Sequence, residues 1–455
     1  MTETLQIINS QQIIREIVGK LANSNRNLVS DEFADGLKCL QDHIDLKVHR
    51  YKTGMPCWTW NVPPKWQIKE GYIKQGGREI VSIKKHPLHV MSYSIPVKKR
   101  MKGEELLEHI HVHRELPDAI PYEFSFYKPQ WGFCMTHAQR NEIKADQDYD
   151  VCIDSESIDD HLSVGEFTIK GQSDEYIVFL GHLDHPCQVN DGLIGAAVNV
   201  ALANRLKGQQ HYYNYMFLFV PETIGSIAFL SHNEHLIPKI RYAVFNEMVG
   251  FKNPLILQKS YDENTLINQY ALAAMETRQG KSMAYPFLTV AGNDEKIFDS
   301  PGVAIPAISV TRVNQEECLT EKARRQKPGT VELVLPYPQY HSHLDNTDLI
   351  DYKMVGETVE YLNDLVNILE KDFIPVRKFK GPVFLTKYNL WIDWRSDIKM
   401  SEKMLWLMYS LEGEMTAFQI SRKLDMDFGK TCQILEKFLE NGLIEKGRIP
   451  IGFDR

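Results

Sequence analysis

Two histidines and two aspartates lie within ten residues of one another in the segment GHLDHPCQVNDGLIGAA, which spans residues 181–197. These residues are His182, Asp184, His185 and Asp191, and the chain becomes apolar directly after them. Imidazoles and carboxylates together are ligands that zinc takes in proteins, and a carboxylate left over can activate a water molecule. The segment therefore predicts a metal site with a hydrolytic function.

Three further polar residues follow apolar runs along the chain. Glu222 follows YMFLFV, Glu247 follows YAVFN, and His341 lies in the later segment YHSHLDNTD. Apolar runs of this kind are typical of strands buried on both faces of a parallel sheet, and ligands bind beyond the carboxyl ends of such strands. We therefore expect these side chains to converge with those of the first segment.

The spacing assigns separate roles to these residues. His182 is two positions before Asp184, whose carboxylate would fix the orientation of the imidazole and raise its basicity. Asp191 lies just before a helical segment and could bridge two ions. Glu222 is the expected general base, which would take a proton from the attacking water. The candidate metal ligands are His182, His185, Asp191, Glu247 and His341.

The pattern between about residues 166 and 370 predicts an α/β core. YIVFLG, GLIGAAVNVALANRLKG and YMFLFV form a strand, a helix and a second strand, which together make a βαβ unit. The fold class that we expect is a mostly parallel sheet flanked by helices. Near the N-terminus, Ser30 is a predicted N-cap for a helix that begins with Asp31 and Glu32.

Changes in the pattern divide the chain into three expected domains. Residues 58–137 contain short strands, with a hairpin at Gly76-Gly77, and form a small β-rich domain inserted into the core. The core itself would consist of residues 1–57 and 138–385. Residues 386–455 contain three helical segments and a short predicted hairpin, which is the pattern of a winged helix.

The composition limits the partners and the compartment that we expect. The chain has 455 residues, of which 43% are hydrophobic and 25% charged, and its net charge of −8 gives no reason to expect nucleic acid. The seven cysteines are scattered, the first twenty residues lack the pattern of a secretory leader, and no apolar run reaches 18 residues. We therefore expect a cytoplasmic protein that binds a small peptide or amide and does not contact a membrane.

In their order and spacing the motifs resemble those of the co-catalytic zinc aminopeptidases. That family has GHLD, D-x-x-x-G, Glu-Glu, a lone acidic residue and H-x-x-x-D. The matching residues here are Gly181 to Asp184, Asp191 with Gly195, Glu222-Thr223, Glu247, and His341 with Asp345. A narrower resemblance covers nearly the whole chain, because WTWNVPPKWQIKEGYIK, LHVMSYSIPV and PDAIPYEFSFYKPQWGFC are similar to the insert of a bacterial aminopeptidase-like family that ends in a winged helix.

The resemblance implies a zinc-peptidase core, one or two zinc ions per chain and an unassigned physiological substrate. The segment GNDEKIFDSPGVAIP is similar to a segment of the zinc aminopeptidases and makes Asp294 a candidate substrate-binding residue. Arg312 is a second candidate, which would bind a substrate carboxylate or phosphate or form a structural ion pair. The family's usual assignment makes His182, Asp191 and Glu247 the more complete metal site, and Asp191 with His341 the poorer one.

The resemblance is incomplete at two positions. In the di-zinc enzymes a second Glu follows the catalytic Glu and binds a metal, whereas Thr223 occupies that place here. We therefore expect one of the two metal sites to be weak or absent. The narrower family also has a His-Pro step, here His185-Pro186, so His182 and His185 remain alternative ligands, with His182 the first choice.

Two rivals to an aminopeptidase-like hydrolase that cleaves a peptide or amino-acyl amide remain open. Thr223 makes a catalytically silent scaffold with the same fold one alternative. The winged helix makes a transcription regulator the other, but its third helix balances two lysines with two glutamates and offers no net positive charge to phosphates. The apolar residues of that helix favour packing against the core or against another subunit of a homo-oligomer; they are Ile434, Leu435, Phe438 and Leu439.

Overall fold

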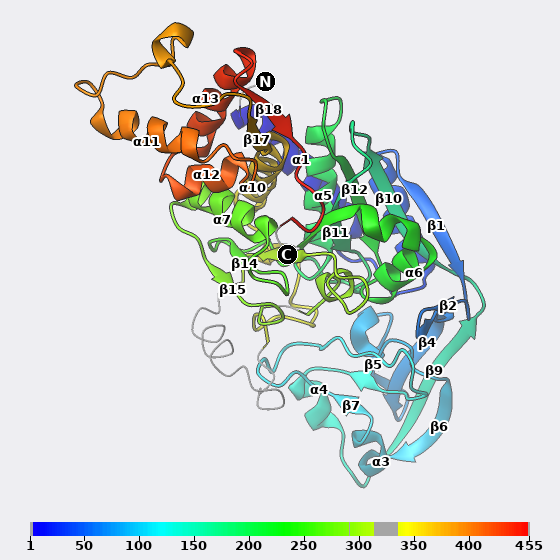
Figure 1. Cartoon of the computed structure of the whole chain (residues 1–455). Helices are drawn as coiled ribbons and strands as arrows, with labels where there is room; N and C mark the ends of the chain where they lie inside the picture. The colour runs from blue at the N-terminus through cyan, green and yellow to red at the C-terminus, as the bar shows by residue number, and fades with distance from the viewer. Residues whose placement is uncertain (1–2, 291, 314–334, 454–455) are drawn as a thin grey trace. The chain divides into compact units, whose positions relative to one another are not determined.

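The computed structural model describes residues 3–290, 292–313 and 335–453, which divide into two compact units (Figure 1). The first unit is Met1–Asn363 and the second is Asp364–Arg455. Helix α10 (Tyr352–Lys371) contains the point at which the first unit ends. All of the candidate site residues belong to the first unit.

The core of the first unit is an eight-stranded sheet with the order β1-β10-β12-β11-β13-β16-β14-β15. Its four central strands, β12, β11, β13 and β16, run parallel, whereas β10 and β14 join them antiparallel. The predicted α/β core is therefore confirmed. The strands are β1 (Lys47–Lys52), β10 (His161–Ile169), β11 (Tyr176–His182), β12 (Asn214–Val220), β13 (Ile240–Asn246), β14 (Ile256–Gln258), β15 (Ala284–Tyr285) and β16 (Ala307–Thr311).

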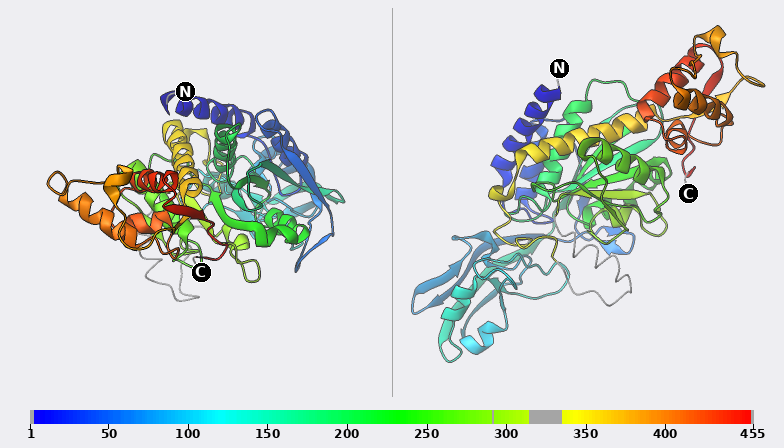
Figure 2. Two further views of the ribbon diagram at one scale, coloured as in Figure 1. Left: turned by 45° about the horizontal axis from the view of Figure 1, so that its top comes forward. Right: turned by 90° about the vertical axis from the view of Figure 1, so that its left-hand side faces the viewer.

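Helices cover both faces of this sheet (Figures 1 and 2). The chain passes from β11 through α5 to β12, and then through α6 to β13 on the other side of β11. Because such crossovers are right-handed, these opposite steps place α5 and α6 on opposite faces, and the end of β11 becomes the place where ligands bind in open sheets. The helices are α1 (Glu3–Leu21), α2 (Asp31–Gln41), α5 (Leu193–Leu206), α6 (Ile224–His232), α7 (Leu266–Gln279) and α8 (Glu295–Phe298).

Contacts between helices fix the layer that contains α5. The Glu360 carboxylate of α10 lies 2.6 Å from Arg205 Nη1 of α5 and 3.9 Å from Arg278 Nη2 of α7. Helix α1 runs alongside the start of α10, where Arg15 Cζ lies 3.8 Å from the centroid of the Tyr352 ring (Figure 2). The predicted N-cap is confirmed, because the Ser30 side chain accepts a hydrogen bond from the backbone of α2.

Helix α5 is apolar on all sides because it lies between the sheet and other helices. Its residues from 193 to 203 are all buried. A Cβ atom at Gly195 would overlap the carbonyl of Asn246, so the helix can approach the end of β13 only with glycine at that position. Among the helices of the described residues, α5 included, none is both long and apolar enough to cross a membrane.

A second sheet, with the order β5-β4-β9-β6, forms the β-rich part of the first unit. Gly76 and Gly77, with φ of 55° and 87°, connect β4 to β5, so the predicted hairpin is confirmed. Strand β9 lies beyond residue 137 and yet pairs with both β4 and β6. The elements are β2 (Pro56–Cys57), β3 (Trp60–Asn61), β4 (Lys65–Gln75), β5 (Arg78–Ser82), β6 (Val97–Lys102), α3 (Gly103–Leu107), β7 (Ile110–His111), β8 (Phe133–Cys134), α4 (His137–Glu142) and β9 (Asp148–Ile158).

A backbone contact joins this β-rich part to the segment that contains His341. Tyr122 N donates to His341 O at 2.7 Å, and His343 N donates to Ile120 O at 3.0 Å. Pro121 and Ser342 form an antiparallel bridge between these two bonds. Residues 120–122 therefore hold the backbone that directly follows the His341 side chain.

After the end of α10, the described residues of the second unit include the helices α11, α12 and α13 and a two-stranded sheet. The strand β18 pairs with β17, which precedes the helices, so the sheet differs from the predicted hairpin and the winged-helix assignment stays a prediction. The four apolar residues of its third helix, 434, 435, 438 and 439, pack into the core of the unit itself, which leaves them with a structural role. The elements are β17 (Ile374–Arg377), α11 (Ile398–Tyr409), α12 (Ala417–Lys423), α13 (Phe428–Glu440) and β18 (Ile444–Gly447).

Candidate metal centre

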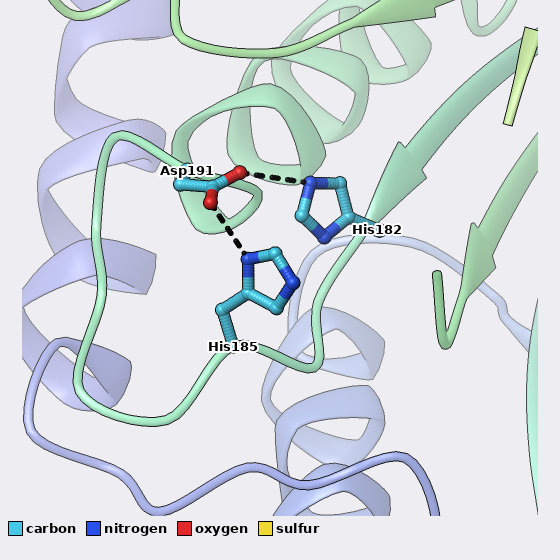
Figure 3. Close-up of side chains that lie close together, drawn as sticks. All are labelled: His182, His185 and Asp191. Carbon is cyan, nitrogen blue, oxygen red and sulfur yellow. Dashed lines mark ion pairs between the residues drawn. The ribbon is translucent and has the colours of Figure 1, made fainter. Parts of the chain in front are cut away.

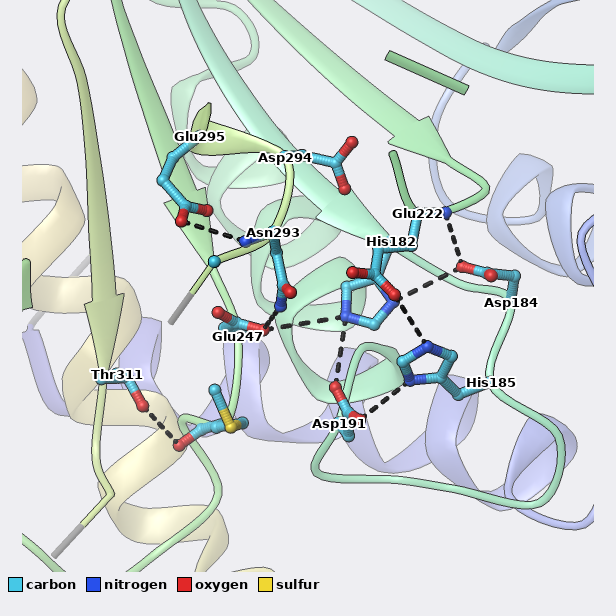
Figure 4. Close-up of polar contacts among 12 residues, drawn as sticks. His182, Asp184, His185, Asp191, Glu222, Glu247, Asn293, Asp294, Glu295 and Thr311 are labelled. Atoms are coloured by element: carbon cyan, nitrogen blue, oxygen red, sulfur yellow. Dashed lines mark hydrogen bonds and ion pairs between the residues drawn. The ribbon is translucent and has the colours of Figure 1, made fainter. Parts of the chain in front are cut away.

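Three adjacent parallel strands bring the site together at their carboxyl ends (Figure 4). His182 is the last residue of β11, Glu222 follows β12 by two residues, and Glu247 directly follows β13. All three lie at the edge where the order of the strands reverses. The segments after β11 and before α10 then supply His185, Asp191 and His341.

Asp191 lies at the centre of the candidate ligands (Figure 3). Its Oδ1 is 3.4 Å from His182 Nε2. Its Oδ2 is 2.9 Å from His185 Nδ1 and 3.2 Å from His341 Nε2. The two oxygens of one buried carboxylate thus face different histidines, which is the arrangement expected of a residue that bridges two neighbouring cation positions.

Glu247 and Asp184 lie on the two sides of His182 (Figure 4). Glu247 Oε2 is 3.9 Å from His182 Nε2 and accepts a hydrogen bond from Asn293 Nδ2. Asp184 Oδ1 is 3.5 Å from His182 Nδ1 and accepts a hydrogen bond of 2.8 Å from Glu222 N. Asp184 therefore contacts both the imidazole of a candidate ligand and the backbone of the candidate base.

His185 connects the metal ligands to Glu222. Its Nδ1 faces Asp191, while its Nε2 lies 3.1 Å from Glu222 Oε2. Thr223 N donates to Asp294 Oδ1 at 3.0 Å. Thr223 brings no carboxylate to the site, and His185 supplies an imidazole on the side of Asp191 where His341 also lies.

The polar atoms at the centre of the site fit a bound cation. Several buried nitrogen and oxygen atoms of the site make no directional hydrogen bond; they include His182 Nδ1 and Nε2, His185 Nδ1, Asp191 Oδ1 and Oδ2, Glu247 Oε1 and His341 Nε2. Buried polar atoms rarely lack partners in folded proteins. His182, His185 and Asp191 also each offer a ligand atom within 4.8 Å of the others.

The charges of the site also favour positive charge at its centre. Burial acts to lower the pKa of His185, but Asp191 and Glu222 raise it to about 10. Burial acts to raise the pKa of Glu222, whereas the contact with His185 and the charges of the histidines lower it to about 2. Burial raises the pKa of Glu247 to about 8, and the neighbouring Glu295 adds to that increase. Acidic groups thus outnumber their partners in a buried space, which a divalent cation would stabilise.

Local backbone structure holds the ligands in place. Asp345, four residues after His341, accepts bonds of 2.9 Å from both Asn190 N and Asp191 N. Gly192 has a φ of 95°, and a Cβ atom there would lie 2.6 Å from His182 Cε1. His341 has a φ of 50°, which is a strained value for a residue other than glycine and is typical of functional sites.

Comparison with known proteins places the chain in a family. A family model described as "Domain of unknown function (DUF4910)" matches residues 15–321, which is more than half of the chain. The chain belongs to this family. A relative from Clostridium acetobutylicum, described as "Putative polysaccharide biosynthesis protein with aminopeptidase-like domain", is 34% identical over 303 residues, which are 66% of this chain and 69% of the relative.

Solved structures show the fold to which this family member is similar. A "putative peptidase" from Clostridium acetobutylicum has a TM-score of 0.81 at 26% identity and covers 97% of this chain and 98% of its own. A zinc aminopeptidase from Bacillus subtilis has a TM-score of 0.57 at 12% identity, with coverages of 80% and 95%. A peptidase M28 precursor from Shewanella amazonensis has a TM-score of 0.52 at 12% identity, with coverages of 81% and 97%. The zinc-aminopeptidase-like fold predicted from the motifs is confirmed.

The two predicted substrate-binding residues lie in different surroundings. Asp294 accepts the hydrogen bond from Thr223 N, and burial raises the pKa of its carboxyl group to about 7. The Arg312 guanidinium is buried and donates to Thr358 Oγ1 at 2.9 Å and to Asn253 O at 2.5 Å. These bonds give Arg312 a structural role that links β16 to α10.

Sequence reasoning missed three residues that surround the ligands. Asn293 donates a hydrogen bond to Glu247 and directly precedes Asp294 in the sequence, so its place near the site could have been predicted from that of Asp294. The ring centroid of Tyr122 lies 5.4 Å from that of His185 and 5.2 Å from that of His341, and Phe124 lies 6.2 Å from His341. These aromatic residues come from the β-rich part, more than 50 residues before the first ligand, and no local pattern predicts that contact.

Proposed function

We propose that the protein is a zinc-dependent hydrolase that cleaves the amide bond of a peptide or an amino-acyl amide. The observation that carries the proposal is Asp191, whose two oxygens face three histidines while the carboxylate of Glu222 lies beside one of them. The fold of the core, which is that of zinc aminopeptidases, supports the same reaction class.

The residues divide into two ligand sets that share Asp191. His182 and Glu247 would complete the set on the Oδ1 side, and His185 and His341 the set on the Oδ2 side. Zinc in such a setting supplies positive charge that polarises an amide carbonyl and lowers the pKa of a water molecule. The imidazole of His185 compensates for the carboxylate that Thr223 lacks, so the proposal includes two cation positions.

Glu222 acts as the general base in this proposal. Its carboxylate lies beside His185, where it would accept a proton from the attacking water and pass it to the leaving nitrogen. The hydrogen bond from Glu222 N to Asp184 fixes the backbone at this residue. Asp184 is therefore a positioning residue that acts on both the base and His182.

An amide attached to a glycan is the second candidate substrate. The observation that favours it is the description of the curated relative, which names polysaccharide biosynthesis. The same residues would perform the same hydrolysis on such a compound, because only the groups around the amide differ. A scaffold without activity is the competing hypothesis, and its distinguishing result is an intact metal site without turnover.

The test combines elemental analysis of the purified protein with a panel of peptide, amino-acyl and glycosyl amides. We expect bound zinc and hydrolysis of at least one amide, and a loss of about 10²- to 10⁴-fold in rate for Glu222→Gln at unchanged zinc content and melting temperature. Glu414→Gln, at an exposed position in the second unit, is the matched control and should keep the wild-type rate. Equal rates for Glu222→Gln and the wild type would exclude this mechanism.

A further inference from the structure

A cavity of about 630 Å³ opens beside His341, between the β-rich part and the core. The β-rich part contributes Tyr122 and Phe124 to its wall, and the core contributes Leu288 and Val290. His341 and Asn293, which binds the candidate ligand Glu247, also line it. The cavity therefore adjoins the candidate metal centre at His341, and its volume lies in the range of small-molecule sites.

Two large apolar side chains are exposed in the lining of this cavity, one from the β-rich part and one from the core. Phe124 is 42% exposed and Leu288 is 45% exposed, although most side chains of their size in the first unit are buried. Leu288 also has a φ of 58°, a strained value for this residue type. Exposed apolar surface of this kind within a concave site is typical of a surface that a ligand covers.

The wall from the β-rich part is held next to the candidate ligand His341. Phe124 stacks on Phe126 with ring centroids 4.4 Å apart, and Tyr122 is bonded through its backbone to His341. The charged residues of the rim are Arg114 and Glu123, which carry opposite signs. The lining therefore favours apolar surface and gives no preference for a charged group.

We infer that this cavity binds a large aliphatic or aromatic side chain adjacent to the scissile amide, with Phe124 and Leu288 as the residues that determine specificity. The inference rests on the proposed amide hydrolysis and names the substrate class for that site. Covering a side chain as large as phenylalanine with apolar surface strengthens binding by about tenfold or more. Glycine, which has no side chain, gains nothing from the same wall.

The test measures binding to the zinc-loaded Glu222→Gln protein, so that no turnover is needed. Isothermal titration with phenylalaninamide, leucinamide and glycinamide should give affinities for the first two that exceed the affinity for glycinamide by about tenfold or more. Phe124→Ala should reduce this ratio at least threefold. Leu288→Asn should also reduce the ratio at least threefold. Because asparagine tolerates a positive φ, this variant removes the apolar contact without adding backbone strain.

The control is Ile95→Ala, because Ile95 is 40% exposed in the β-rich part and does not line the cavity. It should leave the ratio unchanged, and melting temperatures should show that all variants are folded. A ratio near one, or a ratio that neither cavity variant alters, would overturn the inference. Tight binding that the cavity variants weaken, in the absence of hydrolysis by the wild type, would refute the proposed function but not the cavity assignment. Hydrolysis by the wild type without a preference for large side chains would refute the cavity assignment but not the proposed function.

Discussion

His185 Nδ1 lies 2.9 Å from Asp191 Oδ2, which is the shortest distance between a histidine and a carboxylate in the site. This contact places an imidazole beside His341, on the side of Asp191 where Thr223 supplies no carboxylate. Under the proposed function, His185 would therefore serve as a ligand at the metal position that was expected to be weak. Its contribution can be measured directly.

We expect His185→Ala to hold less zinc per chain than the wild type, because it removes one of the two imidazoles that face Asp191 Oδ2. Elemental analysis after dialysis checks this result. Thr223→Glu in the same background should restore part of the zinc, whereas Thr223→Ser, which adds no carboxylate, should not. An unchanged zinc content in His185→Ala would show that the residue is not a ligand.

His341→Ala should also lower bound zinc while the protein remains folded, because the side chain belongs to a segment held mainly by backbone bonds. Elemental analysis measures the bound zinc, and far-ultraviolet circular dichroism shows whether the variant is folded. His235→Ala, at an exposed position outside the site, is the control and should bind zinc as the wild type does. Equal zinc contents for the two variants would contradict the assignment of His341.

Gly192→Ala should disturb the site by two separate effects. The new Cβ atom would meet the His182 ring at 2.6 Å, and the backbone would have to keep a φ of 95° with a side chain present. Gly208→Ala is the matched control, because Gly208 has a φ of 82° and a Cβ atom added there would meet nothing within 4 Å. Both variants should lose about 1 kcal/mol of stability from the backbone, but only Gly192→Ala should lose zinc.

Which parts of this site could be predicted from the sequence depends on how far apart in the chain the contacting residues lie. His182, Glu222 and Glu247 could be brought together from the sequence, because each follows an apolar strand and parallel strands end at one edge. The role of His185 depends on the loop between β11 and α5, whose course no spacing rule determines. The position of Tyr122 depends on pairing with a segment more than 200 residues later, and periodicity carries no information about such a contact.

Outside the site, Glu166 provides a pH-dependent contribution to stability. The contact of 2.6 Å with His49 Nε2, together with a hydrogen bond from Thr168, holds the pKa of the Glu166 carboxyl below its usual value despite burial. A lowered pKa means that the ionised group stabilises the folded state at neutral pH, and that this contribution is lost as the pH falls through the folded-state pKa. Melting temperatures of Glu166→Gln should therefore be lower than those of the wild type at pH 7.

The difference between these melting temperatures should shrink as the pH falls below the ordinary pKa of a glutamate and through the lowered folded-state pKa, where the wild-type carboxyl becomes neutral like the amide. Glu156→Gln is the control, because Glu156 pairs with Lys69 at 2.8 Å on the exposed surface, where such pairs contribute little. A difference for Glu166→Gln that does not change with pH would mean that the carboxylate charge is not the source of the stabilisation.

The backbone bonds between residues 120–122 and 341–343 couple one wall of the cavity to the segment that contains His341. The bond from Tyr122 N to His341 O is independent of the side chain at position 122, so substitutions that keep the backbone in place keep this bond. Under the proposed function, a change that moved this backbone would alter the cavity wall and the position of His341 together. The part of the lining that the core supplies is tied to a different element, because Val290 N donates to Gln258 Oε1 of β14 at 2.8 Å, so a change there would act on the core sheet and not on the bonds to the His341 segment.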